Sequence, residues 1–243
     1  MAQPSEPAPN AVNGHRTSVS AWLDRVRARR REVGNRYTIK LVWLRLVPLS
    51  LFHFEHYFIY GLDLRAWKGG DGGVEAARWA RPGDTNELLR IGMQPDQVKD
   101  LTDVRYRAGV IEREGRIVAY NWCHTGTTAP WPWMRFSLGP GDVWSFRGWT
   151  EPALRGHGLF PQVKGFMAQA YKDQGFVRMV SMIEALNRNQ QKANASLGGR
   201  PIGRLFMLRF LRLTLVGMDG RFRFGWWSAK RPFTLAFDRI GNT

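Results

Sequence analysis

The feature that most constrains the fold is a glycine-containing loop over 150–160, between a strand candidate rich in aromatic residues and a helix. Pro161 suits the first turn of that helix, because its missing N–H would be unpaired there anyway. Gly156 and Gly158 allow the backbone to approach a ligand closely. A helix N-terminus attracts anions. The pattern therefore predicts a strand–loop–helix unit whose loop binds an anion, usually a phosphate.

The chain carries a large positive charge. Its 243 residues include 36 Lys and Arg against 20 Asp and Glu, which gives a formal net charge of +16 and a pI near 10.9. Such an excess indicates an anionic partner: nucleic acid, an acidic membrane surface or a ligand with several phosphates. Charge alone does not choose among the three.

Cysteine content indicates a reducing compartment. Cys123 is the single cysteine, so an internal disulfide is impossible. The N-terminus lacks the basic start and apolar run of a signal peptide. We expect a cytoplasmic protein that can be peripheral to a membrane.

Composition divides the chain into three parts. Residues 1–17 are rich in Pro, Ala, Asn and Ser and are expected to form a disordered tail. Residues 18–73 form a basic and apolar extension that ends in a glycine-rich loop. Residues 74–243 are expected to form the main domain.

The extension is a candidate membrane contact. A basic helix is expected over about 20–33, and an apolar run follows over 39–58. Charged residues and Pro48 interrupt that run, so it is not expected to span a bilayer. Peripheral membrane contact through 18–60 is one interpretation. A solvated helix and packing on the main domain are the others.

Hydrophobic periodicity and turn residues predict the order of elements after residue 73. The expected elements are a strand at 74–79, helices beginning near 85 and 95, a hairpin over 106–113 and 116–124, a loop at 125–141, a strand at 143–150, a helix at 161–175, a strand at 177–185, a helix at 187–197 and strands at 202–216 and 222–227. Asp84 or Thr85 is expected to cap the first helix. This order indicates a mixed α/β (α+β) fold, with a mostly antiparallel sheet flanked by helices and one parallel crossover.

Several residues in this order resemble the GNAT superfamily of N-acetyltransferases over roughly 74–230. Pro152 followed by the run from Arg155 to Gly158 is similar to the family's phosphate-binding loop. Asn187 ends the next strand, and Gly198 follows it by eleven residues, as in the family. The turn over 81–84 also looks like the family's opening.

The resemblance implies acetyl-CoA as co-substrate, with the pyrophosphate on the loop amides and the pantetheine arm along the preceding strand. The residues implied to contact it are Trp149, Thr150, Arg155, Gly156, His157, Gly158, Leu159, Phe160 and Asn187. Phe160 stands where the family has a glycine or alanine. Asn194 stands where many members have a tyrosine that protonates the departing thiolate, so another group or water must do so here.

The implied reaction is direct attack of a primary amine, possibly on an amino sugar, on the thioester carbonyl. A base must take the amine's proton. Glu151, Glu184 and Asp142 are the candidates because each is placed near a strand end. No metal is expected, since His53 and His56 have no third ligand at a diagnostic spacing.

Other interpretations remain open. Four tryptophans could stack on a sugar or could simply pack in the core: Trp131, Trp133, Trp144 and Trp149. The arginines after residue 199 alternate with Leu and Phe, which indicates either a solvated strand face or a platform for an anionic acceptor or a membrane. The alternative function is a non-catalytic module of the same fold that binds nucleic acid or anionic membrane. The acyl chain length and the oligomeric state are not indicated.

Overall fold

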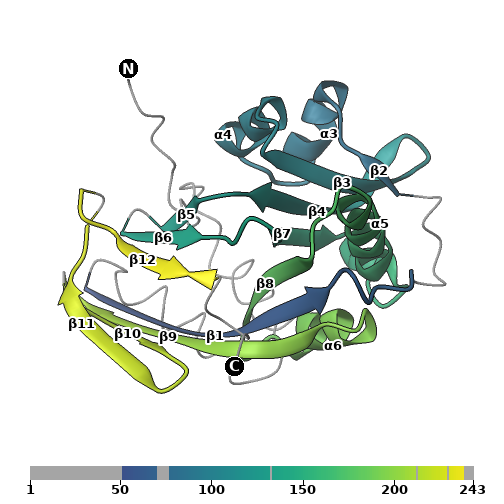
Figure 1. Ribbon diagram of the computed structural model, residues 1–243. Helices are drawn as coiled ribbons and strands as arrows, with labels where there is room; N and C mark the ends of the chain where they lie inside the picture. Colours follow the sequence, from purple (N-terminus) through teal and green to yellow (C-terminus); the bar gives the residue numbers. More distant parts are fainter. Residues whose placement is uncertain (1–50, 70–76, 132, 212, 229, 238–243) are drawn as a thin grey trace.

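The computed structural model describes residues 51–69, 77–131, 133–211, 213–228 and 230–237 (Figure 1). The predicted tail, the basic helix and the apolar run before residue 51 lie outside these residues. They stay predictions.

A nine-stranded sheet organises the structure, in the order β11-β10-β9-β1-β8-β7-β4-β3-β2. Its strands are β1 (Phe52–Asp63), β2 (Ala77–Trp79), β3 (Tyr106–Arg113), β4 (Arg116–Thr125), β7 (Asp142–Thr150), β8 (Arg178–Glu184), β9 (Arg200–Phe210), β10 (Leu213–Met218) and β11 (Arg221–Trp226). Neighbours pair antiparallel except β7 and β8, which are parallel. The predicted fold class is confirmed.

A second, three-stranded sheet covers part of one face of the first (Figure 1). It consists of β5 (Thr128–Trp131), β6 (Met134–Ser137) and β12 (Phe233–Ala236). Phe136 and Leu235 from this sheet are buried in one cluster with Ile59 of β1 and Val180 of β8. The small sheet therefore closes the core over the middle of the large one.

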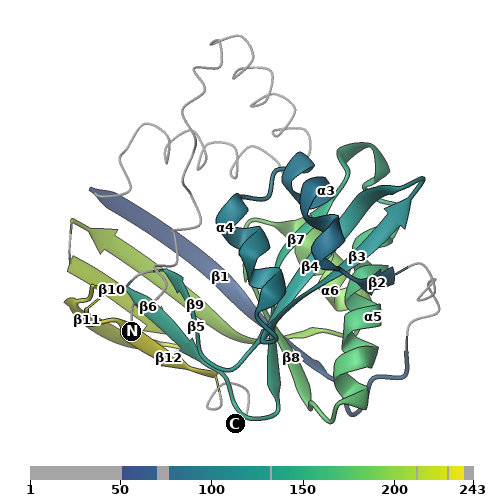
Figure 2. The same ribbon diagram turned by 90° about the horizontal axis from the view of Figure 1, so that it is seen from above.

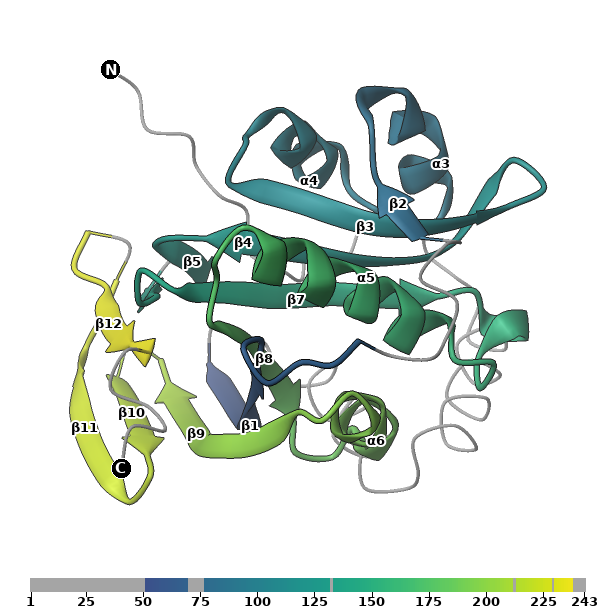
Figure 3. The same ribbon diagram turned by 45° about the vertical axis from the view of Figure 1, so that its right-hand side comes forward.

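Four helices of the described residues flank the large sheet. They are α3 (Thr85–Arg90), α4 (Pro95–Val98), α5 (Leu159–Asp173) and α6 (Arg188–Ser196), with 3-10 turns η2 (Pro82–Asp84), η3 (Lys99–Thr102) and η4 (Pro152–Leu154). Three of the helices cover the half that contains β2, β3, β4 and β7, and α6 lies beside α5 next to β8 and β9 (Figure 3). Val163, Met167 and Tyr171 recur every four residues on α5 and are buried against the sheet, as its apolar periodicity predicts (Figure 3). Leu88 of α3 and Val98 of α4 pack on the opposite face of β3 and β4.

The predicted boundary at residue 74 is wrong for the sheet. β1 lies between β8 and β9 and pairs with both, so residues 52–63 are a central strand rather than part of an extension. The glycine-rich loop after them looks like a linker in sequence, whereas the strand before it is held by hydrogen bonds to partners far along the chain.

Two other predictions of secondary structure, after residue 124, are wrong. The expected loop at 125–141 contains β5 and β6, and the expected single strand at 202–216 is the hairpin of β9 and β10. Leu211 turns this hairpin with φ of 53°. A leucine carries no turn signal, because turns that need positive φ usually use Gly or Asn.

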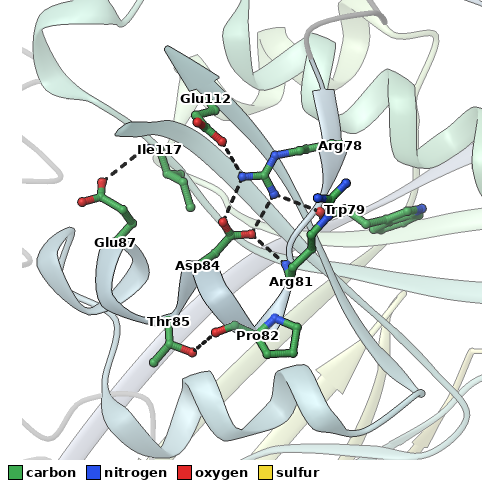
Figure 4. Close-up of polar contacts among 9 residues, drawn as sticks. All are labelled: Arg78, Trp79, Arg81, Pro82, Asp84, Thr85, Glu87, Glu112 and Ile117. Atoms are coloured by element: carbon green, nitrogen blue, oxygen red, sulfur yellow. Dashed lines mark hydrogen bonds and ion pairs between the residues drawn. The ribbon is translucent and has the colours of Figure 1, made fainter. Parts of the chain in front are cut away.

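An arginine–carboxylate network holds the connection from β2 to α3 (Figure 4). Arg78 donates hydrogen bonds to both carboxylate oxygens of Asp84, at 2.7 and 2.9 Å, and to Glu112 Oε2 at 2.5 Å. The Arg78 guanidinium therefore holds the pKa of Asp84 below its usual range. Asp84 occupies the N-cap position of α3 without a side-chain cap bond. Its carboxylate instead accepts hydrogen bonds from the Arg78 guanidinium and from the Arg81 N–H.

Replacing Ile59 tests the central position of β1. Ile59 is 0% exposed, and Ile59→Ala is expected to lower the free energy of unfolding by about 2–5 kcal/mol because it leaves a cavity. Val104→Ala is the control, since Val104 is 91% exposed and should change little. Urea denaturation measures both. Equal stabilities of the two variants would contradict the assignment.

Candidate functional site

The site is built where β7 and β8 stop pairing. Their parallel ladder has four residue pairs and ends at Ser145 and Ser181. Beyond that point β7 pairs with β4 through Thr150, and β8 pairs with β1 through Glu184. Because each strand follows a different neighbour, the two strands diverge and the sheet opens at their C-terminal ends.

A bulge in β7 shapes one wall of this opening. The register between β4 and β7 shifts between Tyr120 and Trp122, and Arg147 has φ of 49°. The next residue, Gly148, is covered by the ring of Phe160. A Cβ atom at Gly148 would lie 2.3 Å from that ring. Bulges often redirect strands beside functional sites, and a larger residue at position 148 would have to displace the Phe160 ring.

The loop predicted from the sequence leads from β7 through η4 to the N-terminus of α5. Gly156 and Gly158 have φ of 85° and 76°, in the left-handed region that favours glycine. Gly158 is the N-cap of α5. The first N–H groups of an α-helix have no partner within the helix, so Leu159 and Phe160 offer theirs at this end.

Charged side chains of the loop are exposed. Arg155 Nε donates a hydrogen bond to the Thr150 carbonyl oxygen at 3.2 Å, across the turn. His157 Nδ1 lies 3.2 Å from the Arg155 carbonyl oxygen. The loop is thus an exposed backbone concavity with an arginine beside it, which is the arrangement that binds anions.

A buried polar cluster lies at the last β7–β8 pair. Asn121 Nδ2 donates to Ser145 Oγ at 2.8 Å, and Lys164 Nζ donates to Ser181 Oγ at 2.6 Å. Lys164 also donates to Asn194 Oδ1. All five side chains are buried. This cluster carries no signal in the sequence, because Lys164 looks like one polar residue of an amphipathic helix.

Burial sets the protonation of this cluster. Removal from water lowers the pKa of Lys164 to about 8 from its usual 10.5. The described hydrogen-bond partners of its ammonium are neutral oxygens. Burial also raises the pKa of the Cys123 thiol, which keeps it protonated at neutral pH. Cys123 is therefore a poor nucleophile.

Asp142, one of the predicted bases, lies at the wrong end of its strand. It begins β7, whereas the loop follows Thr150, and eight residue steps at about 3.3 Å separate them by roughly 26 Å. Its carboxylate is buried and bound by Arg178, at 2.8 Å to Nε and 2.7 Å to Nη2. The sequence placed Asp142 near a strand end without deciding which end.

Glu151 and Glu184 remain as candidate bases. Glu151 directly follows β7, and Glu184 is the last residue of β8. Both lie at the strand ends from which the loop starts, and both side chains are half-buried. The N–H of Glu151 donates to the Val118 carbonyl oxygen at 2.8 Å, which fixes the backbone there. Glu184 pairs with Tyr57 of β1.

Asn187 has a local role that was not predicted. It is the N-cap of α6, and its Oδ1 accepts a hydrogen bond from the Gln190 N–H at 3.1 Å. Its Nδ2 donates to Gln190 Oε1 at 3.1 Å. Contact with a co-substrate stays a prediction.

The tryptophans divide between core and site. Trp131, Trp133 and Trp144 are buried in one cluster, as the core-packing interpretation requires. Trp149 is half-buried and stacks on Tyr120, with ring centroids 5.7 Å apart. Only Trp149 lies beside the opening.

His53 and His56 do not converge on a metal. His53 Nε2 lies 3.0 Å from Glu55 Oε1 on the buried face of β1. Three residues from His53 along the strand, His56 projects from the other face. In the described part of the chain no three potential ligands gather, and no helix there has the length and apolarity to cross a bilayer.

A cavity of about 930 Å³ lies elsewhere. It opens at the starts of β8 and β9, lined by Arg178, Arg200 and residues 139–141 among others. None of the residues predicted for the site lines it. The cavity is thus separate from the opening between β7 and β8.

Comparisons with known proteins concern the fold. No protein-family model and no curated protein sequence matches this chain. Similar solved structures include a protein from Novosphingobium aromaticivorans assigned as a GNAT-family acetyltransferase, at 16% identity over 69% of this chain and 66% of that one, with a TM-score of 0.49. A Drosophila protein is similar at 14% identity over 72% of this chain and 56% of its own, with a TM-score of 0.48.

An aminoglycoside N-acetyltransferase in complex with CoA is also similar, at 14% identity over 50% of this chain and 89% of that one, with a TM-score of 0.42. The Novosphingobium structure is assigned to the family that the sequence resembles. The chain spans 66% and 56% of the first two structures. Likeness at this level carries no activity to this chain, so its function is argued from the site.

The buried lysine predicts a specific pH dependence of stability. Below pH 8 both folded and unfolded states hold the Lys164 proton, and the cost of burying the charge is fully present. Between about pH 8 and 10.5 the unfolded state binds more protons. The free energy of unfolding, relative to Lys164→Met, should therefore rise across that window by roughly 3 kcal/mol.

Urea denaturation from pH 7 to 11 measures this difference, in which contributions from other groups largely cancel. Lys192→Met, on the exposed side of α6, is the control and should follow the wild type. A Lys164→Met curve that runs parallel to the wild-type curve would show that the lysine is not buried as a cation.

Proposed function

We propose that this chain is an acyl-CoA-dependent N-acyltransferase that transfers an acetyl group to a primary amine. One observation carries the proposal. A loop with two left-handed glycines leads into the N-terminus of a 15-residue helix directly beside the point where two parallel strands separate. Such an opening accepts an extended arm between the strands while the loop holds a polyanion at its mouth.

The residues present fit a CoA pyrophosphate. Gly156 and Gly158 present backbone to solvent without side chains, and the helix N-terminus favours negative charge. Arg155 adds a permanent positive charge. In this proposal Trp149 and Thr150 offer backbone groups to the pantetheine arm. Phe160 narrows the opening where its ring covers Gly148.

The proposed chemistry is direct transfer. The neutral amine nitrogen attacks the thioester carbonyl carbon, a C–N bond forms, and the C–S bond breaks. Glu151 or Glu184 accepts the proton that the nitrogen loses, directly or through water. The CoA thiolate takes a proton from solvent, because the Asn194 amide is too weak an acid to transfer one.

The acceptor in this proposal is a small amine, which includes amino sugars, and the protein acts in the cytoplasm. A second candidate is a non-catalytic binding module of the same fold. Asn194 favours it, since this residue is buried and bound to Lys164. Binding of acetyl-CoA without release of free CoA toward any member of an amine library would select the second candidate.

Charge reversal at Arg155 tests the co-substrate site. Arg155→Glu is expected to weaken acetyl-CoA binding about tenfold or more, because it replaces a phosphate partner by a repelling charge. Arg113→Glu is the matched control: it changes the net charge equally and lies in the exposed β3–β4 hairpin. Calorimetry measures both. Equal weakening in the two variants would refute a site at the loop.

Substitution of the two carboxylates tests the base. If Glu151 is the base, Glu151→Gln should lower kcat about 10²- to 10⁴-fold, and if Glu184 is the base, Glu184→Gln should do so. The affinity for acetyl-CoA should be unchanged in both variants. Glu114→Gln, at the exposed hairpin turn, should leave kcat unchanged. The rate of CoA release is the measurement. If kcat survives in both variants, the base is not a carboxylate at these strand ends.

A further inference from the structure

An apolar face remains exposed at the far end of the large sheet. Six of the eight large apolar side chains that are exposed in the described residues gather there: Leu51, Phe210, Leu211, Phe222, Phe224 and Trp226. Trp226 is 69% exposed, and Phe222 and Phe224 are each 64% exposed. β11, which carries three of them, is the edge strand and lies away from α5 (Figures 1 and 2).

Strand register makes these side chains one surface. Phe224 is paired with Leu215, and Trp226 is paired with Leu213, which is paired in turn with Phe210. Since paired residues project to the same side of a sheet, we call Phe210, Leu213, Leu215, Phe222, Phe224 and Trp226 the aromatic face. The Phe222 ring lies across β10, because a Cβ atom on Gly217 would be 2.6 Å from it. Contiguous apolar surface of this kind usually marks an interaction site.

The surroundings of the aromatic face are strongly basic. From Arg200 to Phe237 the sequence has eight arginines and lysines and one aspartate. Arg221 and Arg223 project from the opposite side of β11 and are exposed. Lys230 and Arg231 are exposed beyond it. The edge strand is therefore amphipathic, with aromatic rings on one side and two arginines on the other.

The chain also enters the sheet at this end. The Leu211 N–H donates a hydrogen bond to the Leu51 carbonyl oxygen at 2.8 Å, beside the aromatic face. Residues before Leu51 supply arginine-rich and apolar sequence, including Trp43 and Arg45. β1 therefore begins beside the aromatic face.

We propose that the aromatic face docks on an anionic lipid bilayer. Aromatic side chains partition into the interface between headgroups and acyl chains, and the exposed arginines of the same edge strand attract acidic headgroups. A second copy fits less well, because each copy carries the same excess of positive charge along residues 200–237. Nucleic acid fits less well because the six side chains of the face include no cation. This proposal does not depend on the acyltransferase reaction.

A fluorophore on the aromatic face tests where contact occurs. Cys123 is buried, so Phe224→Cys gives the full chain one accessible thiol for an environment-sensitive dye. We expect a blue shift with vesicles that contain 30% phosphatidylglycerol and little change with phosphatidylcholine alone. Val104→Cys, in the exposed loop after η3, is the control site and should not respond.

Charge variants test the contribution of the two arginines on β11. Arg221→Glu with Arg223→Glu should weaken binding to the anionic vesicles at least tenfold, whereas Arg113→Glu with Arg116→Glu should weaken it about twofold for the same change in net charge. Trp226→Ser with Phe222→Ser should also weaken binding at least tenfold. Co-flotation with the vesicles measures the affinities, and circular dichroism checks that each variant is folded.

Three outcomes would overturn the proposal. Vesicle binding without a shift at residue 224 would place the contact elsewhere, for example in residues 18–50. A dye at residue 224 that is already blue-shifted without vesicles would mean that protein covers the face, and sedimentation would tell a second copy from the chain's own N-terminal segment. A shift caused by nucleic acid and not by vesicles would identify the other anionic partner.

Discussion

The early end of the β7–β8 ladder is the constraint on which the candidate site depends. A parallel pair of strands between antiparallel neighbours can separate because each strand has another partner: β4 holds β7, and β1 holds β8. The separation therefore costs few backbone hydrogen bonds. It places the bulge, the glycine loop and the start of α5 around one opening, and the central position of β1 makes that arrangement possible.

A buried cation lies at the base of this opening, and its energetics differ from those of the surface charges. Lys164 donates to Ser181 and Asn194 within the core, so neutral oxygens stabilise its charge only in part and its burial costs stability. The arginines on β11 are solvated and cost little. The net charge of +16 thus includes two kinds of cation, one buried in the core and the others solvated at the surface. Composition cannot identify the buried cation, because only burial distinguishes Lys164 from the other lysines.

Most helices and strands were predicted from the sequence because turn residues and apolar periodicity lie within the elements themselves or next to them. Turn residues identified the β3–β4 hairpin, and apolar periodicity identified α5. The glycine loop was predicted correctly since glycine at positive φ is a property of single residues. β5, β6 and β12 were missed. These short strands depend on packing against the large sheet, and their own residues resemble an irregular loop.

The sequence by itself determined the mixed fold class, the loop between Thr150 and Leu159, and the positive charge that makes an anionic ligand plausible. Only the tertiary structure decided that residues 52–63 are central, that Asp142 is bound by Arg178 far from the loop, and that Lys164 and Asn194 meet. The tertiary structure also decided the aromatic face, since only the strand register places Phe210 and Trp226 on either side of Leu213. The physical reason is common to all four: each depends on partners distant in sequence, and no local propensity records which strand becomes a neighbour.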